Sequence, residues 1–429
     1  MNGNGRINAT VVVLGDLGRS PRMQYHARSL ADLGAEVDLV GYAGSDLPES
    51  IARHPKIRCH LLPPRPVRAL ERFATSLPSV VSLIRIAFQA MKLFRLLLFG
   101  VRRPDVMLLQ NPPGIPALGV MLICARLRSA SLVVDWHNFG YTVLALKVPR
   151  ESWRVRLTRW YERTLGQHAD GHLCVSRAMQ KELQEGWGLR GVAVVYDRPA
   201  APFIPPRSEE LRGTCPAIAN LFTKNGHNAT HRPALLVTST SWTPDEDFDL
   251  LLDALSRVDA AVARQEACST FPDLRVVITG DGALRGFYEE KIAAMQLRRI
   301  QIRTAWLAPE DYPLLLRSAD LGLCFHRSSS GLDLPMKVAD MLGSGLPVLA
   351  VDYGPCLAER LRHGDNGLVF SNAAELAEQL LELFKDFPEP AHALESLRRN
   401  IARSDEPRWD DEWRACAWPA LRRSLNRHE

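Results

Sequence analysis

The stretch that sets the fold class is residues 8–42, NATVVVLGDLGRSPRMQYHARSLADLGAEVDLVGY. It opens with a β-branched run at 8–14, which favours a buried strand. A polar loop follows, and apolar residues then recur at helical spacing over 22–33. Gly34 ends that helix, and residues 36–42 form a second strand-like run. The stretch therefore predicts a β-loop-α-β unit, from which doubly wound α/β domains are built.

Short apolar runs of the same kind recur through the first half of the chain. Parallel strands that are buried on both faces appear in a sequence as continuous apolar runs. Such runs lie at 106–109, 132–134, 172–175 and 193–195. We therefore expect a first doubly wound α/β domain, Rossmann-like in its element order, over residues 1–200.

The second half repeats this architecture without repeating the sequence. Residues 201–232 are rich in proline and glycine and predict a linker. Apolar runs then follow at 234–238, 274–279, 300–303, 321–325 and 347–351. We expect a second Rossmann-like domain over 233–400, and a Trp- and Arg-rich helix within 401–429 that packs back toward the first domain. Two such domains would face each other across a cleft beside the carboxyl ends of their strands, where open α/β sheets bind ligands.

The composition is that of a globular protein with two or three domains. The 429 residues are 46% hydrophobic and 24% charged. A net charge of +5 is too small to indicate a nucleic-acid-binding protein, but it suits an anionic membrane surface or a phosphorylated substrate. The eight cysteines include no C-x-x-C pair, which favours buried free thiols over a zinc site or a disulfide framework.

Residues 328–341, SSSGLDLPMKVADM, form the most informative functional motif. A Ser/Gly-rich loop at the start of a helix offers backbone N–H groups to a diphosphate, here those of Ser329, Ser330 and Gly331. Lys337 adds a positive charge, and Asp340 follows three residues later on the same helix face. The motif indicates a nucleotide-diphosphate site in which the carboxylate holds ribose hydroxyls. The alternative is an ordinary capped helix with an exposed charge pair.

Residues 83–99 predict a broad apolar helix with one cationic stripe. Arg85, Lys92 and Arg95 fall on that stripe. Three charges argue against a membrane-spanning helix, since each costs ~2.5–3.5 kcal/mol at the centre of a bilayer. One hypothesis is a helix that lies in the headgroup plane of a membrane. The other is an amphipathic helix packed on its own sheet.

Six segments together resemble one family. They are GDLGRSPRMQYH at 15–26, LQNPPG at 109–114, DWHNFGY at 135–141, STSWTPDEDF at 239–248, DYPLLL at 311–316 and the motif at 328–341. The chain resembles the chitobiosyldiphosphodolichol β-mannosyltransferases over nearly its whole length, except for the 201–232 linker. The most specific of the segments are the 328–341 motif and the Trp-His-Asn segment.

The resemblance implies a GT-B fold and an inverting transfer of mannose from GDP-mannose. The acceptor would be the terminal N-acetylglucosamine of a dolichyl-diphosphate-linked chitobiose, on the cytosolic face of the endoplasmic reticulum membrane. Complexes with other mannosyltransferases are a further implication, and no metal or other cofactor is expected. Family members usually begin with a hydrophobic anchor, whereas the first predicted strand here starts at residue 8. We therefore expect the cationic helix to carry membrane contact.

An inverting transfer needs a base for the acceptor hydroxyl, and two residues compete for that role. His137 follows a predicted strand, and imidazole titrates near neutral pH. Its alternative is a structural histidine bound to a backbone carbonyl. Asp16 ends the first strand and is the rival base, or else the N-cap of the next helix. Asp135 either orients His137 or closes a turn. Arg19 is expected to stabilise the departing diphosphate, or to be a solvated loop cation.

Further candidates for the donor site follow strands of the second domain. Ser239, Ser241 and Trp242 form one loop, in which the indole stacks on sugar or base, or fills the interdomain gap. Gly280 and Gly282 let the backbone approach the nucleotide, or simply form a turn. Trp306 follows another strand and is a candidate neighbour of guanine, with core packing as its alternative. At the position of Asp340, similar two-domain transferases commonly carry a Glu.

Residues 245–247, Asp-Glu-Asp, resemble a metal-binding D-x-D motif. Their place before a predicted helix favours capping instead, since carboxylates stabilise the positive end of a helix dipole.

Three other functions compete with sugar transfer from GDP-mannose. A nicotinamide dehydrogenase is disfavoured because no predicted strand ends in G-x-G-x-x-G. A catalytically silent membrane adaptor of the same fold remains an alternative, although Lys337 and Asp340 are both present. A related transferase that uses another sugar nucleotide or a polyprenyl acceptor is the third.

Overall fold

The computed structural model describes residues 7–63, 78–205, 215–222, 232–243, 246–264, 271–385, 387 and 392–426. Contacts divide the chain into two units, one of residues 1–196 and 409–429 and the other of residues 197–408. The division thus falls after Tyr196 and not after residue 200, and the second unit runs on to Arg408. Most of the predicted 201–232 linker lies outside the described residues. Its described part includes a short 3-10 helix, η5 (Pro216–Leu221).

In the described residues, the first unit is built around a parallel sheet of seven strands, in the order β3-β2-β1-β4-β5-β6-β7. The strands are β1 (Asn8–Asp16), β2 (Glu36–Tyr42), β3 (Ile57–Leu62), β4 (Val106–Asn111), β5 (Ser131–Trp136), β6 (Gly171–Cys174) and β7 (Val192–Val194). The helices are α1 (Pro21–Asp32), α2 (Glu49–Ala52), α3 (Pro78–Arg95) with the π-helical turn η2 (Leu96–Gly100), α4 (Ala117–Arg128), α5 (Gly140–Ala145), α6 (Trp153–Gly166), α7 (Arg177–Lys181) and η3 (Glu182–Gly186). Runs such as 11–13 and 132–134 are fully buried, which explains their continuous apolar character.

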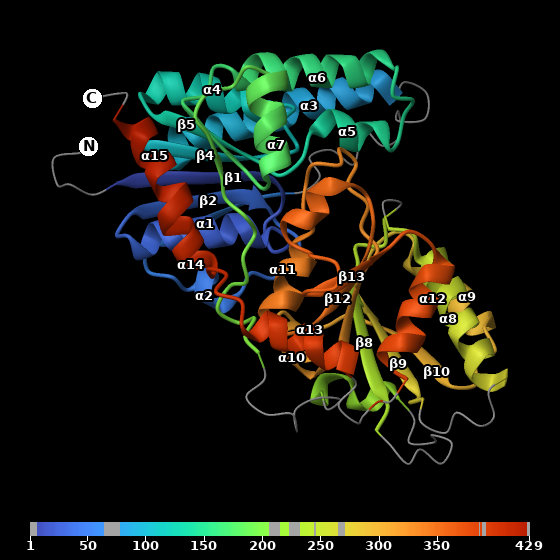
Figure 1. Ribbon diagram of the computed structural model, residues 1–429. Coiled ribbons are helices and arrows are strands. Elements are labelled where there is room, and N and C mark those ends of the chain that lie inside the picture. The colour runs from blue at the N-terminus through green and yellow to red at the C-terminus, as the bar shows by residue number, and fades with distance from the viewer. Residues whose placement is uncertain are drawn as a thin grey trace. The chain divides into compact units, whose positions relative to one another are not determined.

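The C-terminal tail belongs to this unit and covers part of its sheet. It forms α14 (Trp409–Glu412), η7 (Trp413–Ala417) and α15 (Trp418–Leu425), drawn in red in Figure 1. Trp409 and Trp413 are buried in the same core cluster as Val11 and Val133. The tail therefore completes the hydrophobic core of the first unit.

The described part of the second unit contains a parallel six-stranded sheet of the same winding, in the order β10-β9-β8-β11-β12-β13. Its strands are β8 (Ala234–Ser239), β9 (Leu274–Thr279), β10 (Ile300–Ala305), β11 (Leu321–Cys324), β12 (Val348–Val351) and β13 (Gly367–Phe370). Its helices are α8 (Phe248–Arg264), α9 (Arg285–Ala294), α10 (Asp311–Ser318), α11 (Met336–Gly343), η6 (Pro355–Glu359), α12 (Ala373–Leu383) and α13 (His392–Ala402). Two doubly wound α/β units confirm the predicted fold class.

The strand register sets where the loops of each unit begin. In the first sheet Asn111 pairs with Trp136, so β4 and β5 end at the same level. In the second, Ser239 pairs with Thr279 and Thr279 with Ala305, so three strand ends are level. Each unit also reverses its winding direction beside its first strand, between β1 and β4 and between β8 and β11. Ligands bind at such switch points in open α/β sheets.

Candidate active site

His137 lies directly after β5 at the carboxyl edge of the first sheet. Its backbone N–H donates to the carbonyl of Asn111 at the end of the neighbouring strand, at 2.8 Å. Its ring Nε2 lies 2.8 Å from Oδ2 of Asp135, and the imidazole is partly exposed. The predicted contact between Asp135 and His137 is therefore present in the first unit.

Asp135 is the centre of a buried polar cluster. Arg22 of α1 grips its carboxylate with two nitrogens, at 2.8 and 2.9 Å, and Nε2 of His26 lies 3.1 Å away. Burial opposes ionisation, but the Arg22 guanidinium and the hydrogen bonds of both histidines hold the pKa of the Asp135 carboxyl well below its usual range. An ionised Asp135 is an acceptor for the Nε2–H of His137, and a neutral ring held in this way has its lone pair on Nδ1. This is the tautomer that a general base requires.

The tail of the first unit fixes the second histidine of this cluster. Trp413 donates its indole N–H to Nδ1 of His26 at 2.8 Å, so Nε2 of His26 carries the proton that faces Asp135. Burial lowers the pKa of His26, which keeps the ring neutral. The cluster thus holds one carboxylate between one guanidinium and two imidazoles.

Asp16 makes loop contacts, and its predicted role as the N-cap of the next helix is wrong. Its carboxylate accepts the N–H of Gly18 at 3.0 Å and both the N–H and the hydroxyl of Ser45, at 2.9 and 2.8 Å. Helix α1 begins at Pro21, and its N-cap is Ser20. Asp16 therefore joins two loops, and its oxygens are engaged by donors that a base would have to surrender. Arg19 lies exposed in the same loop.

Glu162 is a residue of this region that sequence reasoning missed. It lies on α6 with no exposed surface, accepts the Asn111 amide at 2.9 Å, and accepts the N–H of Gly140 at 2.8 Å. Burial raises its pKa to about 7 against the opposing effect of these hydrogen bonds. Glu162 therefore ties the end of β4 to the loop that follows His137. Arginines and aromatic residues flank Glu162 in the sequence, and this pattern does not indicate that the glutamate is buried.

In the second unit, Lys337 is held in place and is not a mobile cation. Its Nζ donates to the carbonyl of Ser239 at 2.5 Å and forms an ion pair with Glu246. Glu246 is buried and also accepts the hydroxyl of Thr240 and the N–H of Ser241, the latter at 3.1 Å. Glu246 thus joins the start of α11 to the loop after β8.

The D-x-D hypothesis has a clear outcome at two of its three positions. Asp247 accepts the N–H of Asp249 at the start of α8, at 3.1 Å, which is the predicted capping role. Glu246 pairs with Lys337 instead, and Asp245 lies outside the described residues. Within the described ranges, no cluster of three His, Cys, Asp or Glu side chains is arranged to hold a metal.

The Ser/Gly loop differs from the predicted one in where its helix begins. Helix α11 starts at Met336, five residues after Gly331. The N–H of Gly331 donates to the Ser328 hydroxyl at 2.8 Å, and Ser330 contacts the Asp333 carboxylate at 3.2 Å. Ser329 lies between them, half-buried. The loop is therefore organised around Asp333, and the N–H groups of 329–331 do not form the end of the helix.

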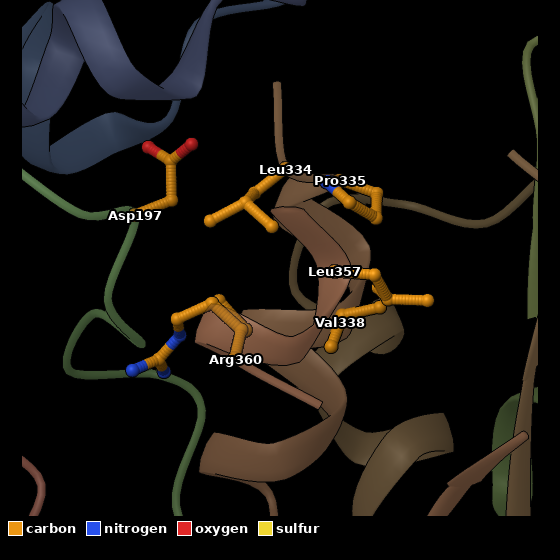
Figure 2. A pocket seen from close by; sticks show the side chains of 7 residues that line it. Asp197, Leu334, Pro335, Val338, Leu357 and Arg360 are labelled. Atoms are coloured by element: carbon orange, nitrogen blue, oxygen red, sulfur yellow. The ribbon is translucent and has the colours of Figure 1, made fainter. Parts of the chain in front are cut away.

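Asp340 lies in a different electrostatic environment from Lys337. Burial, together with the charge of the Asp197 carboxylate, raises the pKa of Asp340 well above its usual range. The two side chains of the motif therefore do not form the predicted charge pair. A small pocket lies nearby, lined by Asp197, Leu334, Pro335, Val338, Ala339, Leu357 and Arg360. Figure 2 shows the Asp197 and Arg360 side chains on one side of this pocket and those of Leu334, Pro335, Val338 and Leu357 on the other.

Trp242 is a core residue, so both of its predicted roles are wrong. Its ring is buried against Phe248 and Tyr288, and its N–H donates to the carbonyl of Gly280 at 3.2 Å. The glycines serve the same packing. A Cβ at Gly280 or Gly282 would lie 1.8 Å from a backbone oxygen of the 240–241 loop. These glycines therefore let two protein loops approach each other.

Trp306, in contrast to Trp242, is 57% exposed, so its predicted alternative of core packing is wrong. It follows β10 at the same sheet edge as Ser239, whose hydroxyl lies 3.0 Å from that of Tyr312. Ser241 is exposed in the neighbouring loop. Unlike the buried Trp242, the indole of Trp306 is exposed to solvent at a strand end.

The cationic stripe lies on α3 of the first unit. Arg85 and Lys92 are half-buried, Arg95 is exposed, and Nζ of Lys92 lies 4.6 Å from the ring centre of Phe88. Across the residues that the structure describes, each helix is too short or too polar to traverse a bilayer.

Comparison with known proteins places this chain among glycosyltransferases. Residues 18–197 match the family model described as "Glycosyl transferase 4-like domain", and residues 232–386 match "Glycosyl transferases group 1". Among solved structures, a TarM structure from S. aureus aligns with a TM-score of 0.62 at 10% identity, over 99% of each chain. A sucrose-phosphate synthase from Thermosynechococcus elongatus aligns with a TM-score of 0.59 at 13% identity, over 98% of this chain and 97% of the other. The protein is thus a GT-B glycosyltransferase.

Curated relatives give the narrower assignment. "Chitobiosyldiphosphodolichol beta-mannosyltransferase" of Pongo abelii is 42% identical over 96% of this chain and 92% of its own length. The human protein of the same name is 40% identical over 98% and 93%. "UDP-glycosyltransferase TURAN" of Arabidopsis thaliana is 44% identical over 97% of each chain. The chain belongs to the chitobiosyldiphosphodolichol β-mannosyltransferase family, as its motifs indicate.

Proposed function

We propose that this enzyme transfers mannose from GDP-mannose to the terminal N-acetylglucosamine of a dolichyl-diphosphate-linked chitobiose, with a β-1,4 linkage. The observation that carries the proposal is identity of 34–42%, over nearly the full chain, to relatives named for β-mannosyl transfer to chitobiosyldiphosphodolichol. The acceptor class would place the enzyme at the cytosolic face of the endoplasmic reticulum membrane. Neighbouring mannosyltransferases are proposed as partners.

His137 supports the proposed chemistry as the base. Its Nδ1 would take the proton of the acceptor hydroxyl as that oxygen bonds to the anomeric carbon of mannose. The bond between that carbon and the diphosphate oxygen breaks at the same time, and GDP leaves with the electron pair. Inversion follows because the hydroxyl attacks from the face opposite the leaving group. A positioned base contributes about 10²–10⁴-fold to such a step.

The second unit is proposed to bind the donor. The Ser328–Gly331 loop and Lys337 would face the diphosphate, Asp340 the ribose hydroxyls, and Trp306 the base. Lys337 is already paired with Glu246, so its charge toward a diphosphate is partly offset in the free enzyme. Arg19 of the first unit is proposed to stabilise the diphosphate as negative charge develops on it.

Donor identity has one competing candidate. The name of the Arabidopsis relative specifies a UDP-linked donor. Thermal-shift titration with GDP, UDP, ADP and NAD separates the two, because a ligand that binds only the folded state raises its apparent stability. Selective stabilisation by GDP supports the mannosyl donor. Selective stabilisation by UDP contradicts it, and no response to any of the four favours the silent adaptor.

The transfer itself is tested with GDP-mannose and a synthetic phytanyl-diphosphate chitobiose. We expect loss of product with Lys337→Ala and at least a 100-fold lower rate with His137→Ala. The exposed residues Lys181 and His168 provide matched controls, and Lys181→Ala and His168→Ala should keep the normal rate. Full activity of both site variants would overturn the assignment of these residues.

A further inference from the structure

Three helices of the first unit expose large apolar side chains to solvent. They are α3 with its extension η2, then α4, and then α6. The most exposed of these side chains are Phe99 (82%), Trp153 (67%), Leu83 (66%), Leu127 (63%) and Trp160 (60%), with Met91, Ile123, Leu157 and Ile84 following. Single exposed apolar residues are ordinary, but a group of nine on three neighbouring helices marks an interaction surface.

These side chains form stripes that face away from the core. On α6, Trp153, Leu157 and Trp160 follow the i, i+4, i+7 spacing of one helix face, whereas Val155 and Glu162 are buried. On α4, Ile123 and Leu127 repeat that spacing. Helix α4 contacts both α3 and α6, and Figure 1 shows the three helices gathered on one side of the strands. We call the exposed stripes of α3–η2, α4 and α6 the three-helix face.

The charged residues of the same three helices are almost all basic. Their sequences contain nine Arg or Lys residues: Arg85, Lys92, Arg95, Arg126, Arg128, Arg154, Arg156, Arg159 and Arg163. The single acidic residue among them, Glu162, is fully buried. The whole chain, by comparison, has a net charge of +5. These three helices are therefore more cationic than the protein as a whole.

We propose that the three-helix face lies on an anionic membrane surface, with its tryptophans at headgroup depth. Indole rings favour that depth, and surrounding arginines are attracted to anionic headgroups. A second copy of this chain is a poor occupant, because the same positive charge would meet itself. The inference deepens the proposed function and rests on it only in taking the acceptor to be lipid-linked. It extends the predicted contact beyond α3 to α4 and to α6, and α6 carries the exposed Trp153 and Trp160.

Two variants of the full-length protein separate the apolar and the charged contributions. The apolar variant combines Trp153→Ser, Leu157→Ser and Trp160→Ser, and the charge variant combines Arg126→Gln, Arg156→Gln and Arg163→Gln. A control removes three exposed charges elsewhere, with Arg399→Gln, Arg403→Gln and Arg422→Gln. Binding is measured by co-flotation with phosphatidylcholine vesicles, with and without phosphatidylserine, at low and high salt. Thermal melting checks that each variant folds.

We expect the wild-type protein and the control to bind vesicles that contain phosphatidylserine, and to bind them less at high salt. The charge variant should bind about 100-fold more weakly, since each basic residue near an anionic surface contributes about fivefold. The apolar variant should lose at least tenfold on either vesicle. If the folded variants bind the vesicles as tightly as the wild-type protein does, the proposal is overturned. It is also overturned if the wild-type protein self-associates in a concentration-dependent way and does not bind vesicles.

A water-soluble short-chain acceptor distinguishes this inference from the proposed function. Both face variants should transfer mannose to that acceptor at the wild-type rate. Vesicle binding without transfer to any acceptor would refute the proposed function and leave the three-helix face standing. Transfer of mannose without vesicle binding would support the proposed function and refute membrane binding by the three-helix face.

Discussion

Replacing Glu162 with glutamine tests the buried carboxyl beside the loop of His137. The pKa of Glu162 is raised by burial from 4.5 to about 7. A carboxyl whose pKa is higher in the folded state stabilises the fold below its unfolded pKa, and that contribution is lost as the pH rises through the folded value. The shift of about 2.5 units corresponds to about 3 kcal/mol at 1.36 kcal/mol per unit. The wild-type protein should therefore lose about 3 kcal/mol relative to Glu162→Gln between pH 4 and pH 7.5.

The assay has to follow the first unit alone, because a two-unit protein need not unfold in one step. Urea unfolding monitored by hydrogen–deuterium exchange of peptides from β4 and β5 meets this need. Taking the difference between the two proteins at each pH cancels every other titrating group. Glutamine keeps the size of the side chain and accepts hydrogen bonds, so the fold should be retained. If the two pH profiles run parallel within about 1 kcal/mol, Glu162 does not titrate as its burial requires.

Three further predictions follow from named contacts. Asp135→Asn should destabilise the first unit by ~3–5 kcal/mol, because Arg22 would stay buried without its charge partner. The double variant Arg22→Met, Asp135→Leu should recover much of the melting temperature, but it should not transfer mannose. Gly282→Ala should lower the melting temperature because its Cβ would lie 1.8 Å from a backbone oxygen, and Gly286→Ala, with open space around it, should not. Trp306→Ala should leave the melting temperature unchanged. It should raise the Kd for GDP, measured by calorimetry, about 5–100-fold, because the base would lose its stacking partner. An unchanged Kd would show that Trp306 does not belong to the site.

The doubly wound fold could be predicted because each strand is a short continuous segment that is buried on both faces and is therefore apolar throughout. The run at 132–134 is continuous and apolar for that reason, and it forms the core of β5. Helix ends were less readable. The helix expected at 83–99 begins at Pro78 and continues through a π-helical turn to Gly100, because apolar spacing does not show where tertiary contacts extend a helix.

The site could be predicted only where its residues are close in sequence. Asp135 and His137 are two residues apart at one strand end, so their contact was visible from the motif. Lys337 and Glu246 are 91 positions apart, and only the fold shows that they pair. Trp242 looked like a ligand-stacking residue because a tryptophan in a loop is usually half-exposed, yet its loop turns inward.

The anomeric configuration of the product decides whether this enzyme is a β-mannosyltransferase. The full-length enzyme is incubated with GDP-mannose and phytanyl-diphosphate chitobiose, and the one-bond carbon–proton coupling at the new anomeric centre is measured by NMR. We expect a single β-linked mannose on O4 of the terminal N-acetylglucosamine. An α-linked product, or sugar transfer only from a uridine donor, would contradict it.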